Sequence, residues 1–222
     1  SIAFSVAFTV HNLQMFFSHI LTVILKTYMT NTNKFFMSNE SDPEIRGVLI
    51  KNQAVVLEPN LQQQLKQKGY GEMDKSKLAL KSFESLYLLF TGRLALFREK
   101  KNIDFDSFLK ICKKQDKDIL TRFLVYRDLR NRGYTVKDGL DFGSDFRVYN
   151  KPFSSKSTSQ FLVFSLNEGK HEKISKLQKK VECITKMDKE PIIAVVQRQG
   201  EIIYYKISKT NFYQNTKKIV MK

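Results

Sequence analysis

Several residue types are scarce or missing in this sequence, and each absence narrows the classes of protein to which it can belong. The chain of 222 residues has no tryptophan, two cysteines, three histidines, four prolines and nine glycines. Cys112 and Cys183 are too few for a disulfide-stapled fold and have no CxxC spacing, so we expect a reducing, cytoplasmic setting. The low glycine and proline content excludes collagen-like and low-complexity chains. So few histidines leave little room for a zinc site. We expect no metal and no cofactor.

Acidic residues are also few, and this imbalance points to a class of partner. There are 38 lysines and arginines against 22 acidic residues, which gives a formal net charge of +16. At 42% hydrophobic residues the chain can nevertheless bury a real core, so it is not a disordered basic tail. The basic residues gather in 98–101, 110–117, 122–132 and 206–222. Such an excess predicts a polyanionic partner, with nucleic acid first.

The first part of the chain lacks charge altogether, since Lys26 is the first charged residue. An uncharged stretch of this length could span a bilayer, which takes about 20 residues. However, it contains His11, Asn12, Gln14 and His19 and has no basic region at its start. Three interpretations remain open for residues 1–36: a membrane anchor, a docking or disordered extension, and an over-extended start. We do not favour membrane contact, and we leave this segment out of the fold.

The rest of the chain divides into two predicted domains and a tail. Residues 37–115 read as a small α+β domain, with strands in 47–57, a helix over 59–68, a strand at 77–80, a helix capped by Ser82, a strand at 93–97 and a helix capped by Asp106. Residues 116–210 read as an α/β domain and residues 211–222 as a basic tail. The predicted fold class is thus an α+β module followed by an α/β domain with a mixed sheet flanked by helices.

The second domain alternates between helical and strand patterns. We expect helices over 116–132 and 172–187 and strands over 134–137, 145–150, 161–166, 192–196 and 202–208. The continuous apolar runs 161–166 and 192–196 are typical of strands buried on both faces. In 145–150 the apolar Phe146 and Val148 alternate with Arg147 and Tyr149, so we expect Tyr149 to be exposed.

Several motifs of the second domain, taken in order, resemble a known family. They are YRDLRNRGY at 126–134, GSDFRVY at 143–149, FLV at 161–163 and KEPIIAVV at 189–196. Together they resemble the tRNA-splicing endonucleases of archaea over residues 118–208. The segments KGYG at 68–71 and SLYLLFTGRL at 85–94 are similar to that family's N-terminal domain.

The resemblance implies an activity and three catalytic positions. The family cuts precursor tRNA at bulge-helix-bulge intron junctions without a metal, leaving a 2′,3′-cyclic phosphate and a 5′-hydroxyl. Its tyrosine takes the 2′-hydroxyl proton, its histidine protonates the leaving 5′-oxygen, and its lysine stabilises charge in the transition state. The tyrosine matches Tyr149 and the lysine matches Lys189, but Thr158 occupies the histidine position. His171 is a weak substitute, because it lies beyond the following strand.

Because the general acid is missing, we expect the chain to be inactive alone. The resemblance then implies the structural subunit of a heterotetramer, paired with a catalytic subunit and acting on precursor tRNA. A catalytic subunit with a displaced acid, or a homo-oligomer, remains the alternative. The hairpin 192–207 is the expected interface between subunits. The expected RNA-binding residues are Arg127, Arg130, Arg132, Arg147 and Lys206.

Two further departures from the family pattern bear on this role. Glu182 stands where catalytic relatives often carry a basic residue, which weakens an autonomous active site. The loop 197–200 lacks the acidic residues that in relatives insert into a basic pocket of a neighbouring subunit, so it stays open which side of that contact this chain supplies.

Two rival functions remain. One is a general RNA-binding module with no part in splicing. The other is a metal-dependent nuclease built on Asp145, which would need a second acid and a lysine on the strand 161–166. That strand has neither.

Overall fold

The computed structural model describes residues 45–139, 143–150, 158–159, 161–171 and 173–208. The predicted N-terminal extension 1–36 and the basic tail 211–222 therefore lie outside the described residues. Within the described ranges, none of the helices is both long enough and apolar enough to cross a membrane.

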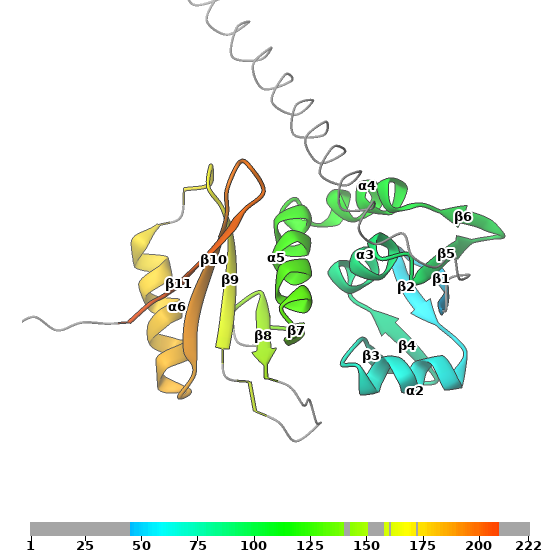
Figure 1. The fold of residues 1–222 in the computed structure, drawn as a ribbon, viewed down its shortest axis with the longest axis horizontal. Helices are drawn as coiled ribbons and strands as arrows, with labels where there is room; N and C mark the ends of the chain where they lie inside the picture. The colour runs from blue at the N-terminus through cyan, green and yellow to red at the C-terminus, as the bar shows by residue number, and fades with distance from the viewer. Residues whose placement is uncertain (1–44, 140–142, 151–157, 160, 172, 209–222) are drawn as a thin grey trace, which may run out of the picture. The chain divides into compact units, whose positions relative to one another are not determined.

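The first half of the described chain builds a six-stranded sheet (Figure 1). Its strands are β1 (Ile45–Ile50), β2 (Gln53–Val56), β3 (Glu72–Asp74), β4 (Lys77–Leu80), β5 (Leu94–Arg98) and β6 (Lys101–Ile103). They lie in the order β3-β4-β2-β1-β5-β6, with β1 and β5 parallel and every other pair antiparallel. The helices of this half are α2 (Pro59–Gln67), α3 (Ser82–Phe90) and α4 (Phe105–Gln115).

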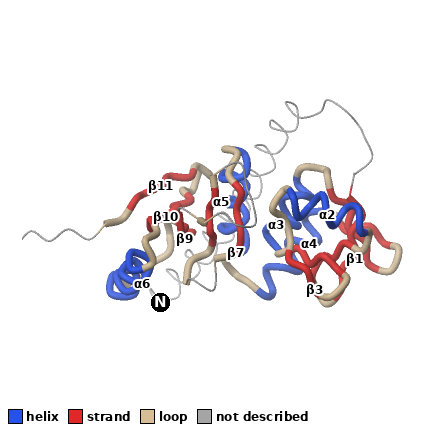
Figure 2. The backbone as a smooth tube through the Cα atoms, turned by 90° about the horizontal axis from the view of Figure 1, so that it is seen from below, coloured by secondary structure: helices blue, strands red, loops and turns tan. Residues whose placement is uncertain are grey.

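The second half builds a five-stranded mixed sheet between two helices. Its elements are α5 (Ile119–Asn131), β7 (Thr135–Asp138), β8 (Phe146–Tyr149), β9 (Phe161–Asn167), α6 (Ile174–Lys186), β10 (Glu190–Val196) and β11 (Ile202–Lys206). The strand order is β11-β10-β9-β8-β7, and only β9 and β10 are parallel. The helices α5 and α6 lie on opposite sides of this sheet (Figures 1 and 2). This arrangement confirms the predicted fold class.

One hydrophobic core is shared by both halves. Phe83 of α3 packs edge-on against Phe146 of β8, with ring centroids 5.1 Å apart, and lies 4.9 Å from the ring of Tyr126 on α5. All three side chains are almost completely buried. A smaller cluster, formed by Leu162, Phe164, Ile184 and Ile193, lies between the other face of the second sheet and α6.

The structure differs from the sequence-based expectations at several element ends. The cap of α3 is Lys81, and Ser82 is the first helical residue. The cap of α4 is Asp104, whose carboxylate accepts the Ser107 N–H at 2.9 Å, whereas Asp106 lies in the first turn. The short strands β3 and β6 were not expected, because three residues are too few to show a periodic pattern.

Candidate active site

The pairing of β8, β9 and β10 brings two of the predicted catalytic residues to one end of the second sheet. Val148 pairs with Phe161 in the antiparallel β8–β9 ladder, and Glu190 pairs with the same Phe161 in the parallel β9–β10 ladder. Tyr149 follows Val148 and Lys189 precedes Glu190, so both lie at the end of the sheet where β9 begins. They flank β9 from two sides, about 10 Å apart by strand spacing.

Tyr149 is buried, which corrects the expectation of an exposed strand-end tyrosine. Its exposed fraction is 8%. The alternation of β8 still holds, since Phe146 and Val148 belong to the core shared with α5 and Tyr149 faces the other way. The face that carries Tyr149 is therefore covered as well. Lys189 is partly exposed.

The remaining two predicted positions lie at opposite ends of β9. Thr158 is exposed and comes three residues before β9, at the end that holds Tyr149 and Lys189. His171 is exposed and follows the end of β9, where the Glu168 N–H donates to the Val196 carbonyl at 3.0 Å. The length of β9 places His171 about 20 Å from the Tyr149 end of the same chain. Within one subunit, this imidazole is out of hydrogen-bonding reach of Tyr149.

Two of the arginines predicted to bind RNA pack against aromatic rings of the first half of the chain. The Arg130 guanidinium lies 4.2 Å from the centre of the Tyr70 ring and donates to the Lys68 carbonyl at 3.2 Å. Arg127 lies 5.3 Å from the centre of the Phe90 ring. These contacts attach α5 to the first half of the chain. Part of the basic excess in 122–132 is thus structural.

The other three predicted RNA-binding residues have carboxylate or carbonyl partners. Arg132 contacts Asp128 at 2.6 Å, and its side chain is 55% exposed. Lys206 contacts Glu190 at 2.9 Å, with 62% of its side chain exposed. Arg147 is partly buried, and its Nε donates to the Asp138 carbonyl at 2.8 Å. Arg132 and Lys206 retain the solvent access that contact with a phosphate requires.

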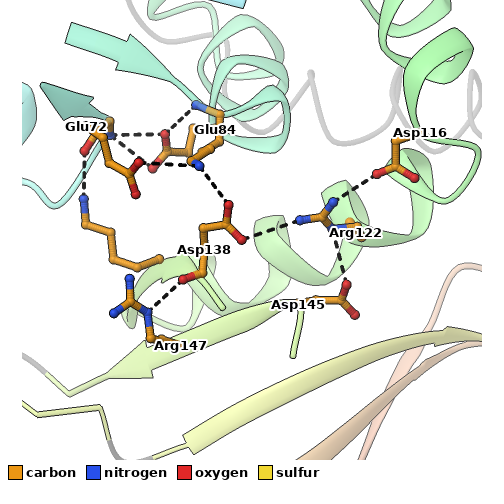
Figure 3. A network of polar contacts seen from close by, with 10 residues as sticks. Glu72, Glu84, Asp116, Arg122, Asp138, Asp145 and Arg147 are labelled. Carbon is orange, nitrogen blue, oxygen red and sulfur yellow. Dashed lines mark hydrogen bonds and ion pairs between the residues drawn. The ribbon is translucent and has the colours of Figure 1, made fainter. Parts of the chain in front are cut away.

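A partly buried arginine, which no sequence motif pointed to, organises the polar contacts between α5 and the second sheet (Figure 3). Arg122 contacts carboxylates of Asp116 at 3.0 Å, Asp145 at 3.4 Å and Asp138 at 4.0 Å, and its side chain is 16% exposed. Lys81 of the first half contacts the same Asp138 at 2.9 Å. The only sequence signal was a cation inside an otherwise apolar stretch of helix.

Glu84 is a second buried polar residue for which no sequence motif predicted a role. Its carboxylate is 1% exposed and accepts the Lys81 N–H at 2.9 Å and the Gly71 N–H at 3.1 Å. Gly71 has a φ of +64°, and a Cβ at this position would lie 2.8 Å from a Leu78 side-chain carbon. The KGYG segment therefore needs glycine at this position. Burial raises the pKa of Glu84, although the two N–H groups and nearby cations oppose the rise.

The surroundings of Asp145 do not resemble a metal site. One carboxylate oxygen accepts the Ser165 N–H at 2.6 Å, and the other faces Arg122. Both oxygens are thus occupied by donors of positive character, which would repel a cation. Among the described residues, no three histidine, cysteine or acidic side chains gather in a way that could hold a metal ion.

The fold and this site define a two-module protein whose second sheet presents a tyrosine and a lysine at one end. A family model described as the tRNA intron endonuclease N-terminal domain matches residues 45–109, and the model of the catalytic C-terminal domain matches residues 119–204. The chain belongs to the tRNA intron endonuclease family.

Within that family, the chain is similar to archaeal tRNA-splicing endonucleases. It is 34% identical to the tRNA-splicing endonuclease of Pyrococcus abyssi over 145 residues, which are 65% of this chain and 84% of that protein. It is 39% identical to the tRNA-splicing endonuclease of Methanococcus vannielii over 143 residues, which are 64% of this chain and 80% of that protein.

Proposed function

We propose that the chain is the structural subunit of a tRNA-splicing endonuclease that removes introns from precursor tRNA in the cytoplasm. In this proposal it pairs with a catalytic subunit, in a heterotetramer that cuts bulge-helix-bulge junctions without a metal. Residues 37–115 and 116–210 are its two domains. The observation that supports the proposal is the end of the second sheet where β9 begins: Tyr149 and Lys189 lie there, and Thr158, three residues before β9, takes the position of the family's histidine.

The proposed chemistry explains why the missing imidazole matters. The ribose 2′-oxygen attacks phosphorus, the bond from phosphorus to the 5′-oxygen breaks, and a 2′,3′-cyclic phosphate forms. The Tyr149 oxygen would accept the 2′-proton, and the Lys189 ammonium would stabilise negative charge on the phosphoryl oxygens. The departing 5′-oxygen needs a proton in return. A threonine hydroxyl at position 158 barely ionises near neutral pH and is a poor acid.

An active subunit is the second candidate function, and the position of Tyr149 and Lys189 favours it. Two of the three family positions keep their residues and lie at one sheet end. In an oligomer, an acid from a neighbouring subunit could complete such a site. A general RNA-binding module has no specific observation in its favour.

Cleavage of an intron-containing precursor tRNA in EDTA tests these proposals. We expect no cleavage by the chain alone and cleavage after a catalytic subunit is added. We also expect Thr158→His to raise the cleavage rate of the chain alone by at least about 100-fold, because general acids contribute about 10²–10⁴-fold. Thr158→Ala is the matched control and should give no gain.

Cleavage by the unmodified chain alone, abolished by Tyr149→Phe, would show that it is an active subunit. Binding of RNA without a preference for the junction, and without any contribution to cleavage beside a catalytic subunit, would leave the general RNA-binding module as its function.

A further inference from the structure

Two hairpin turns of the first sheet hold residues other than glycine in the left-handed backbone region. Lys51 and Asn52 connect β1 to β2 with φ angles of 47° and 67°. Glu99 and Lys100 connect β5 to β6 with φ angles of 50° and 79°. Two-residue turns with both φ angles positive strongly favour Asn-Gly, because other side chains are strained there. Both turns thus keep charged side chains where glycine would fit better.

These two turns are neighbours in the sheet. Val48 pairs with Phe97 in the parallel β1–β5 ladder, and continuing this register by three residues places Lys51 beside Lys100. The Arg98 Nη2 donates to the Asn52 Oδ1 at 3.2 Å, so the first turn is bonded to the end of β5. The side chains of both turns are therefore presented from one end of the sheet.

The two turns gather positive charge that no ion pair within the described part of the chain neutralises. Four exposed cations lie in these turns or directly beside the second one, and we name this set the turn-pair cluster: Lys51, Arg98, Lys100 and Lys101. The two turns contain one acidic residue, Glu99, which is also exposed. None of the ion pairs among the described residues includes a member of the cluster. Adjacent strands are about 5 Å apart, which is within a Debye length of about 8 Å, so these charges repel one another.

We propose that the turn-pair cluster binds the phosphate backbone of the RNA substrate. Both backbone strain and charge repulsion oppose folding of the free protein, and a polyanion would relieve the repulsion. Exposed lysines on turns can bind backbone phosphates, because this binding depends on positive charge and does not require a shaped pocket. The cluster belongs to the first sheet and the candidate active site to the second, so its role is affinity and placement of the RNA. The proposal deepens the proposed function and rests on it for the identity of the substrate.

The proposal is tested by a variant that relieves the backbone strain of both turns and removes their lysines. It combines Lys51→Asn, Asn52→Gly, Glu99→Asn and Lys100→Gly, which gives both turns the favoured Asn-Gly pair. Two lysines and one glutamate are lost, so the net charge falls by only one. The control is Lys75→Asn with Lys77→Gln, which lowers the net charge by two at the β3–β4 turn, at the opposite end of the same sheet.

Binding of the full chain is measured with an intron-containing precursor tRNA and with a plain RNA duplex, at several salt concentrations. We expect the Asn-Gly variant to melt at a higher temperature yet to bind at least about tenfold more weakly near 0.1 M salt. Its slope of log affinity against log salt should fall in magnitude by about 1.4–1.8, because two lysines are removed and each phosphate contact contributes about 0.7–0.9. The control should bind like the unmodified chain.

Unchanged affinity and slope in the Asn-Gly variant would overturn the proposal, and so would an equal loss in the control. If the Asn-Gly variant binds both RNAs more weakly, the cluster proposal is supported. If the unmodified chain also binds the duplex as tightly as the precursor tRNA, this result counts against the splicing function. Failure of the cluster proposal alone would leave the cleavage test of Thr158 and Tyr149 unaffected.

Discussion

At the scale of single residues, the most unusual group is the Glu84 carboxylate in its apolar surroundings. It is 1% exposed and accepts the Gly71 and Lys81 N–H groups. A carboxyl whose pKa is raised by folding binds its proton more tightly in the folded chain than in the unfolded one. Its contribution to stability is therefore complete below the unfolded pKa of about 4.3, and it is lost as the pH rises through the folded pKa.

We predict a pH-dependent stability difference between the unmodified chain and Glu84→Gln. The glutamine side chain has nearly the same shape but does not titrate. As the pH rises from about 4 towards neutral, the unmodified chain should lose stability relative to the variant, since folding must then bury an ionised group. Urea unfolding at a series of pH values measures this difference. A difference that stays constant or changes in the opposite direction contradicts the prediction.

Single residues were predictable from the sequence only in part. Tyr149 and Lys189 were assigned from the resemblance to a family, and the sheet register places them at one end. The burial of Tyr149 was not predictable, because alternation along a strand says which face a side chain takes and not what covers that face. Arg122 and Glu84 were missed because some of their partners, Asp145 for Arg122 and Gly71 for Glu84, lie more than ten residues away in the sequence.

At the scale of elements, one cation joins α5 to the second sheet. Arg122 of this helix contacts Asp138 of β7 and also Asp116 and Asp145. We predict that Arg122→Met lowers the free energy of unfolding by about 3 kcal/mol, because it removes the cation from the partly buried carboxylate of Asp145 and one of the two cations beside Asp138. Urea denaturation measures the change.

The control for this prediction is Arg132→Ala on the same helix. Arg132 forms an ion pair with Asp128, and its side chain is 55% exposed. Loss of this exposed pair should lower the free energy of unfolding by no more than about 1 kcal/mol. Similar effects of the two substitutions would show that the Arg122 network does not stabilise the fold as proposed.

Long elements with a clear period were predicted well, and short ones were not. The helix pattern over 116–132 corresponds to α5, and the apolar run 161–166 corresponds to β9. The caps of α3 and α4 were placed too late, because serine and aspartate also occur in first turns and the cap depends on backbone angles. The hairpin strands β3 and β6 depend on pairing with a neighbour, which no local pattern reports.

At the scale of the whole molecule, β11 is an edge strand with apolar side chains in solvent. Ile203 is 36% exposed and Tyr205 is 51% exposed, and both lie within the hairpin that we predict to be the subunit interface. We predict that Ile203→Lys with Tyr205→Lys prevents association of subunits, because charges on an edge strand block pairing and burial. Light scattering after size-exclusion chromatography measures the assembly.

Folding should be unaffected by this pair of substitutions, since both side chains are already exposed, and the melting temperature checks this. Met73→Lys is the matched control, because Met73 is 44% exposed on the edge strand β3 of the other sheet. An assembly that survives the β11 substitutions, or that is lost equally with Met73→Lys, counts against this interface.

The aromatic contact of Phe83 with Tyr126 and Phe146 has a consequence for how such a gene can be shortened or divided. A polypeptide translated only from α5 onward would keep Tyr149 and Lys189 but would present two bare rings to water, where Phe83 had shielded them. Such a polypeptide should aggregate or be degraded before it can bind RNA. We therefore expect both stretches of coding sequence to be inherited together, whichever polypeptide performs the cleavage.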